Sequence, residues 1–185
     1  MTPRKLLLTT VAAVWFALHT TPAAARPRPD GHLGGRAFEA NKTFGLGLEL
    51  GAPTGLNGKW FFASDRALDF GIGDVYHYAN RSGIHIYADY LLHPTSLASN
   101  ENFELPFFVG IGGRFWDFRD TGAPPPNDAF AIGLRVPLGI SFDFNTVPLD
   151  LFIQVVPILD FYGGNAIHSI YLDFDASVGV RYWFN

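Results

Sequence analysis

The sequence predicts an all-β protein, an eight-stranded antiparallel up-and-down transmembrane β-barrel with a filled, charged lumen. Long segments alternate between apolar and polar side chains with a period of two, which is typical of β-strands. The chain is 48% hydrophobic and 16% aromatic, yet after the first 25 residues it has no apolar run long enough for a membrane-spanning helix. A barrel reconciles these observations because its membrane signal is spread over alternating strands. The chain has no cysteine, so the sheet must hold the fold without disulfides.

The clearest alternation lies at the C-terminal end, in residues 169–184. Even-numbered positions from Ile170 to Phe184 are all apolar, whereas Asp173, Asp175 and Arg181 stand on the other face. The segment is much longer than the usual strand of about 5–6 residues. We therefore expect it to be the closing strand of the barrel.

Seven further segments share this pattern, namely residues 44–51, 56–62, 67–73, 83–92, 105–115, 130–142 and 149–159. Polar or proline-containing stretches between them are expected to be loops, at residues 74–82, 93–104, 117–128 and 161–168. Of these, 93–104 would be an unusually long connection on the side of the chain termini. Pro137 and Pro157 fall inside predicted strands, so a bulge or a weakened ladder is expected there.

The region before the strands divides into two parts. Residues 1–25 have the features of a cleaved signal peptide: Arg4 and Lys5, then an apolar run, then a small-residue cleavage site. Residues 26–43 contain proline, glycine and charge without apolar periodicity, which predicts a flexible periplasmic leader. Residues 44–185 then form the barrel domain of an exported protein.

The direction in which the two faces point distinguishes two kinds of barrel. A soluble, lipocalin-like barrel has its apolar face inside, whereas a membrane barrel has it outside. Here the polar face is rich in glycine, and small residues fit the narrow interior of an eight-stranded barrel. The charges on that face are therefore expected to form a structural network in the lumen, because buried charges need partners and arginine suits several carboxylates at once. The predicted members are Glu49, Lys59, Asp69, Asp89, Arg114, Arg135, Asp150, Asp173, Asp175 and Arg181.

Aromatic residues gather at the segment ends, as in interfacial girdles, and the chain resembles the small eight-stranded outer-membrane barrels of the OmpA and OmpX type. The stretch from Gly51 to Trp60 more particularly resembles an outer-membrane barrel family of unknown function. The resemblance implies an outer-membrane location, with membrane lipids and the barrel assembly machinery as partners. Such barrels commonly end in Phe, so Tyr182 and Phe184 are the expected C-terminal assembly signal. Asn185 after Phe184 departs from that pattern.

The sequence contains no recognisable catalytic, metal or cofactor motif. Its histidines lack the spacing of a zinc site, and His85 and Asp89 would lie about 13 Å apart along one strand. His168 and Ser169 invite comparison with outer-membrane lipid A deacylases, but neighbours on a strand point to opposite faces. An acidic chain, of net charge −4, without a basic cluster argues against nucleic acid.

We therefore expect no enzyme activity and no cofactor, but a structural or surface-interaction role. An extracellular partner would bind through the loops. A proton or ion path through the lumen is the less favoured interpretation of its charges. The alternatives for the whole protein are an outer-membrane lipid-modifying enzyme and a soluble periplasmic lipocalin-like binder.

Overall fold

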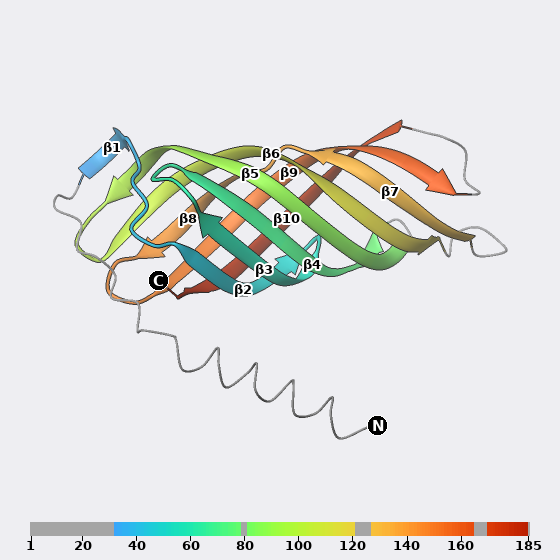
Figure 1. Cartoon of the computed structure of the whole chain (residues 1–185), viewed down its shortest axis with the longest axis horizontal. Helices are drawn as coiled ribbons and strands as arrows, with labels where there is room; N and C mark the ends of the chain where they lie inside the picture. Colours follow the sequence, from blue (N-terminus) through green and yellow to red (C-terminus); the bar gives the residue numbers. More distant parts are fainter. Residues whose placement is uncertain (1–31, 79–80, 121–126, 165–169, 185) are drawn as a thin grey trace, which may run out of the picture.

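A computed structural model describes residues 32–78, 81–120, 127–164 and 170–184. In these ranges the protein is all-β, with ten strands in one antiparallel sheet (Figure 1). Within the described residues, no helical segment has the length and apolar character of a membrane span. The signal peptide predicted for residues 1–25 lies outside these ranges and stays a prediction.

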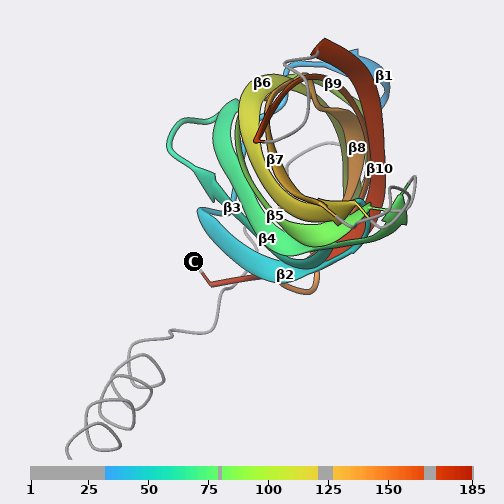
Figure 2. The same cartoon turned by 90° about the vertical axis from the view of Figure 1, so that its right-hand side faces the viewer.

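The strands are β1 (His32–Arg36), β2 (Phe44–Gly51), β3 (Thr54–Phe61), β4 (Arg66–Tyr78), β5 (Arg81–Ser99), β6 (Phe103–Asp120), β7 (Asn127–Arg135), β8 (Leu138–Phe144), β9 (Leu149–Gly164) and β10 (Ile170–Trp183). Each strand from β2 to β6 pairs with the next. β6 pairs with both β7 and β8, and both of these pair with β9. β10 then joins β9 to β2, so the sheet closes into a ring of eight neighbouring strands, whose ribbons encircle a common axis (Figure 2).

β7 and β8 together occupy one place in the ring, and the break between them lies at Pro137. The β7–β9 ladder ends at Arg135 opposite Ile158, and the β8–β9 ladder begins at Leu138 opposite Val155. Pro157 faces this same break. The weakened ladder predicted at the two prolines is thus confirmed, because proline cannot donate a backbone hydrogen bond.

Most predicted strands are longer in the structure, and the predicted loops are correspondingly shorter. Residues 74–82 continue β4 to Tyr78 and begin β5 at Arg81, and residues 117–128 likewise extend β6 to Asp120 and begin β7 at Asn127. The long connection predicted for residues 93–104 is wrong. β5 continues to Ser99 and β6 starts at Phe103, with register shifts in their pairing. Ser and Asn content suggested a loop there, but the backbone at Ser96 and Ser99 pairs with β1 on one side and β6 on the other.

The predicted leader also differs from the structure where it is described. β1 pairs with the end of β5, at Ser96–Ser99, and Phe38 and Lys42 are buried. This segment contacts the ring through single side chains such as Phe38 and Lys42, and not through one face of a strand. Its sequence therefore shows no apolar periodicity. Residues 26–31 lie outside the described ranges.

The two faces of the sheet have the polarity predicted for a membrane barrel. In β10, Leu172 and Phe174 are 68% and 58% exposed, whereas Asp173 and Asp175 are 7% and 5% exposed. The same alternation runs around the ring: 31 large hydrophobic side chains are exposed and 23 polar or charged ones are buried among the described residues. A lipocalin-like binder has the opposite polarity, with its apolar face inside.

Candidate functional site

All ten predicted lumen residues are buried inside the ring. Eight of them join three groups, each built around one arginine, and Glu49 and Lys59 are exceptions. The groups lie at successive depths, from Arg114 near the start of β10 to Arg181 near its end. The interior is therefore filled with charged side chains of both signs.

Arg114 of β6 connects three strands. Its guanidinium donates to both carboxylate oxygens of Asp160 on β9, with Nε at 3.0 Å from Oδ1. It also donates to Asp173 at 2.6 Å and to Asp175 at 3.0 Å, both on β10. One planar cation thus satisfies three carboxylates, as arginine's forked donors allow.

Arg135 of β7 forms the second group. Its Nε lies 3.1 Å from both oxygens of Asp89, and its Nη1 donates to Asp175 at 3.3 Å. Asp175 therefore belongs to both groups. The guanidinium stacks 4.2 Å from the centre of the Tyr87 ring, and Nη1 lies 3.4 Å from Nε2 of His85. His85 is thus a member of a structural network at the centre of the ring.

Arg181 of β10 holds the third group together. It makes a two-point contact with Asp150, at 3.1 and 3.0 Å, and a third contact with Asp69 at 3.0 Å. Its Nη1 also donates to Asn57 Oδ1 at 3.2 Å. This group links β3, β4, β9 and β10 on both sides of the seam where the ring closes.

Glycine makes these contacts across neighbouring strands sterically allowed. Gly133 of β7 lies between Arg114 and Asp160 in register, and a Cβ there would lie 2.3 Å from Asp160 Oδ1. Gly112 stands in the same way between Asp89 and Arg135. In each case an arginine and an aspartate meet above a glycine, which has no side chain to separate them. The predicted role of glycine, fitting a narrow interior, is confirmed at these positions with a more specific cause.

Glu49 was expected to pair with a cation, and this expectation is wrong. Its carboxylate accepts hydrogen bonds from Tyr87 Oη at 2.6 Å, from Gln154 Nε2 at 3.0 Å and from the Ser177 hydroxyl. All three donors are neutral. Neutral donors on the strands around it took the place of the predicted ion pair.

Lys59 was also expected to pair, and no carboxylate forms an ion pair with it among the described residues. Its ammonium group instead lies 5.1 and 4.8 Å from the ring centres of Phe61 and Phe108. The reason is competition. Asp69, directly opposite Lys59 on β4, and Asp150 are both bound by Arg181.

The sequence interpretation missed several interior residues. Asp160 lies one position beyond the predicted end of its strand, although the alternation of Ile158, Asp160 and Tyr162 continues past that end. The neutral members Asn57, Tyr87, Gln154 and Ser177 carry no charge and were therefore not singled out. Among the described residues, nine Asp and Glu side chains are buried against five Lys and Arg side chains.

Apolar clusters lie at both ends of this polar interior. At the end near the start of β10, Trp116, Phe118, Tyr162 and small residues pack together. At the opposite end of the ring, where β2 begins and β10 ends, Ala67, Leu91 and Phe108 pack with Phe61. The charged groups are therefore enclosed along the axis as well as by the wall.

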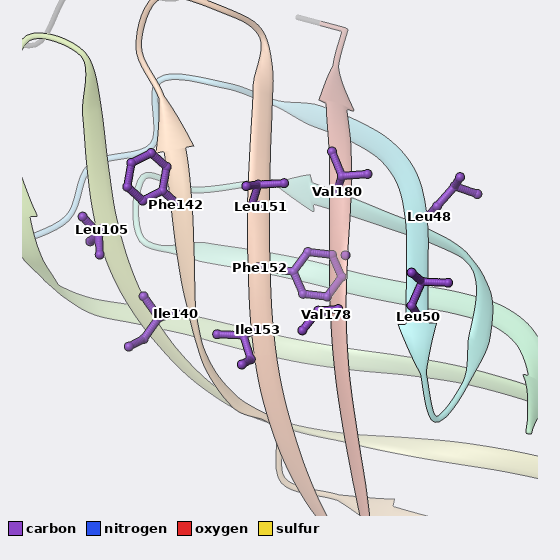
Figure 3. Close-up of a pocket in the computed structure, with 11 residues that line it drawn as sticks. Leu48, Leu50, Leu105, Ile140, Phe142, Leu151, Phe152, Ile153, Val178 and Val180 are labelled. Atoms are coloured by element: carbon purple, nitrogen blue, oxygen red, sulfur yellow. The ribbon is translucent and has the colours of Figure 1, made fainter.

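The outer face of the wall has one notable hollow, of about 630 Å³, across β2, β10, β9, β8 and β6 (Figure 3). Leu48, Val178, Ile153, Ile140 and Leu105 show its character, since one comes from each strand. No charged side chain lines it. It is part of the exposed apolar face and has no group suited to chemistry.

The interior does not assemble a recognisable catalytic set in the described chain. No group of three or more His, Asp or Glu residues is placed to hold a metal ion within the described ranges. His85 Nδ1 lies 3.9 Å from Asp175 Oδ2, and the Tyr87 ring beside the imidazole donates its hydroxyl to Glu49. His168 and Ser169, the pair considered for lipid chemistry, lie outside the described residues.

Comparison with known proteins adds a family. The model of a family described as "Protein of unknown function (DUF3996)" matches residues 36–182, which is most of the chain. Searches of the curated proteins and of the solved structures returned no match.

Proposed function

The chain belongs to the DUF3996 family of proteins of unknown function, and we propose that it is an eight-stranded β-barrel of the bacterial outer membrane with a structural or surface-interaction role. The observation that carries the proposal is the reversed polarity of the ring. Apolar side chains cover its outside while charges fill its inside. In water this arrangement would expose far more apolar surface than a monomer normally shows.

The closed ring supports the same proposal. Lipid cannot hydrogen-bond the backbone, so a spanning sheet must have no free edge, and β10 closes onto β2 over seven paired positions. A spanning strand needs about 9–11 tilted residues. β4, β5, β6, β9 and β10 exceed this length, whereas β2 and β3 have 8 residues each and make a lower wall.

Aromatic side chains at the end of the ring where β2 begins and β10 ends suit a membrane interface. Trp60, Phe62 and Tyr90 follow one another across β3, its turn and β5, with ring centres 6.0 and 5.8 Å apart. Tyr182 and Phe184 lie 5.0 Å apart further round. Such belts lie at headgroup depth. This end would face the periplasm, with Tyr182 and Phe184 as the assembly signal, and outer-membrane lipids and the assembly machinery as partners.

The enclosed interior favours a role other than conduction. Arginine groups bridge the wall at three depths and apolar clusters lie at both ends, so we assign the lumen charges to holding the strands in register. Function toward a partner would then reside at the extracellular end, beyond the paired ends of β4 and β5, of β6 and β7, and of β9 and β10.

Two measurements on the whole protein test the membrane assignment. We expect it to stay in the membrane fraction after carbonate washing, and to migrate faster on SDS gels without heating than after heating. Release by carbonate as a monodisperse protein that needs no detergent would overturn the proposal.

A matched pair of substitutions separates a lipid-facing wall from a merely apolar surface. Ile153→Arg places a charge at an exposed position on the wall of β9, and a membrane barrel should lose about 2–4 kcal/mol of folding free energy there. Leu97→Arg places the same charge on the extension of β5 beyond β4, where the cost should be within about 0.5 kcal/mol. Equal, small costs at both positions would contradict a lipid-facing wall.

A further inference from the structure

Residues 36–43, which we call the N-terminal strap, cross the end of the ring where β2 begins and β10 ends. At one side, Thr95 of β5 donates a side-chain hydrogen bond to the Arg36 carbonyl at 3.1 Å. Midway, the Ala40 amide donates to the Ser64 carbonyl at 2.7 Å, in the turn between β3 and β4. Beyond it, Lys42 forms an ion pair with Asp143 of β8. These anchors lie on β5, on the turn between β3 and β4, and on β8, so the strap spans the opening.

Phe38 is the part of the strap that enters the ring. Its side chain is 4% exposed, and its ring centre lies 5.8 Å from that of Phe61 and 5.3 Å from that of His93. Phe61 and His93 in turn contact Trp183 and Phe108 respectively. One aromatic side chain therefore closes this end above a layer of other rings.

The layer beneath Phe38 contains polar groups without partners. His93 Nε2 and Trp183 Nε1 are buried, and no hydrogen bond to either is found among the described residues. Lys59 is 1% exposed, and its ammonium group lies over the Phe61 and Phe108 rings. His93 contacts the same two rings. Keeping such groups from water has a free-energy cost. Water that enters after the strap moves can hydrogen-bond these groups and remove that cost. This gain offsets part of the free energy needed to displace the strap.

The strap is also separable from the ring. β1 is the last strand of the sheet order and pairs only with β5, at three positions with a register shift. The ring closes through β2 and β10. Thr43, the last strap residue, accepts a hydrogen bond from the Phe61 amide of β3 at 2.7 Å and stays with the ring, so residues 36–42 can move without opening the closure of β2 onto β10.

We propose that the N-terminal strap is a displaceable stopper, which switches this end of the ring between a closed state and an open one. In the closed state Phe38 separates Lys59 and His93 from water. In the open state small water-soluble molecules reach them. This inference does not depend on the membrane assignment, since it concerns only the strap and the chamber beneath it.

Amine acetylation of the full-length folded protein tests the seal. Lys42 and Lys59 are the only lysines after residue 5, so mass spectrometry can follow Lys59 separately after treatment with sulfosuccinimidyl acetate. We expect Phe38→Ala to raise the Lys59 acetylation rate at least tenfold. Phe118→Ala removes a similarly buried ring from the cluster at the other end, and should leave the rate within twofold of native. A Phe38→Ala rate equal to native, in protein that keeps the native far-ultraviolet circular dichroism spectrum, would overturn the proposal.

A lock on the strap tests displacement itself, and does not depend on Phe38→Ala folding. The chain has no cysteine, so Ala40→Cys with Ser64→Cys provides a single pair that can be joined by a disulfide or a short bismaleimide. We expect Lys59 in the joined protein to be acetylated at least tenfold more slowly than in the same variant left reduced. Equal rates would show that labelling does not require the strap to move, and the stopper would be refuted.

Discussion

The two halves of the ring's interior hold their charges by different means. In the half near the start of β10, Arg114 and Arg135 between them bind four aspartates, and Asp175 is shared. In the half where β2 begins and β10 ends, Arg181 binds two aspartates, while Glu49 accepts from neutral donors and Lys59 contacts two aromatic rings without an ion pair among the described residues. In the first half the ion pairs share members and form one network. In the second half each charged side chain has its own set of contacts.

This difference predicts how each half tolerates the loss of a charge. Where one cation serves several carboxylates on different strands, its removal leaves all of them buried without compensation. Where a charge has no counterion in contact, its removal leaves no opposite charge behind. Replacing the cations one at a time therefore measures how far the two halves differ.

The largest effect is expected from Arg114→Met. It removes the partner of Asp160, Asp173 and much of that of Asp175, and breaking a buried pair costs about 3–5 kcal/mol. Urea unfolding in detergent or lipid vesicles, followed by the gel shift, measures the loss. Failure to fold is the upper limit of the same outcome.

Arg114→Lys is the matched control, because it keeps the charge but lacks the forked donors. It should recover only part of the loss, since one ammonium cannot reach all three carboxylates in the same geometry. Full recovery by lysine would mean that charge alone matters, and the account of a multi-strand bridge would be wrong.

The period-two alternation of the sequence predicts which charged side chains are buried, but not which of them pair with one another. Period-two patterns identify which residues share a face, so the burial of all ten predicted charges, Arg135 and Asp150 among them, follows from the sequence. Alternation does not report register. Which carboxylate meets which arginine depends on how three neighbouring strands of the ring are aligned, as with Arg114, Gly133 and Asp160.

The missed features have equally physical causes. Neutral donors such as Gln154 look like ordinary strand residues until Glu49 is found beside them. The strap depends on two side chains, Phe38 and Lys42, whose partners lie far along the chain. No local pattern marks either one.

An intermediate effect is expected from Gly133→Ala, which tests whether the first half needs its glycine bridge. The new Cβ would lie 2.3 Å from Asp160 Oδ1, 2.8 Å from Ile158 Cγ2 and 3.0 Å from Arg114 Cγ. Overpacking of this kind costs about 1–3 kcal/mol, again measured by urea unfolding. Gly113→Ala is the control, since a Cβ there meets only the Gly133 carbonyl at 3.6 Å. Similar losses at both glycines would show that backbone preference, and not the Arg114–Asp160 contact, sets the cost.

The smallest effect is expected from Lys59→Met in the second half. Like Arg114→Met, it removes one buried positive charge, but Asp69 and Asp150 keep their contacts with Arg181. Methionine retains an apolar chain against Phe61 and Phe108, and the desolvation of an ammonium without a contacting carboxylate no longer opposes folding. We expect the free energy of unfolding to stay within about 1 kcal/mol of native, with any change upward. A loss as large as that of Arg114→Met would mean that Lys59 neutralises the Arg181 group through space, and the two halves would then obey one rule.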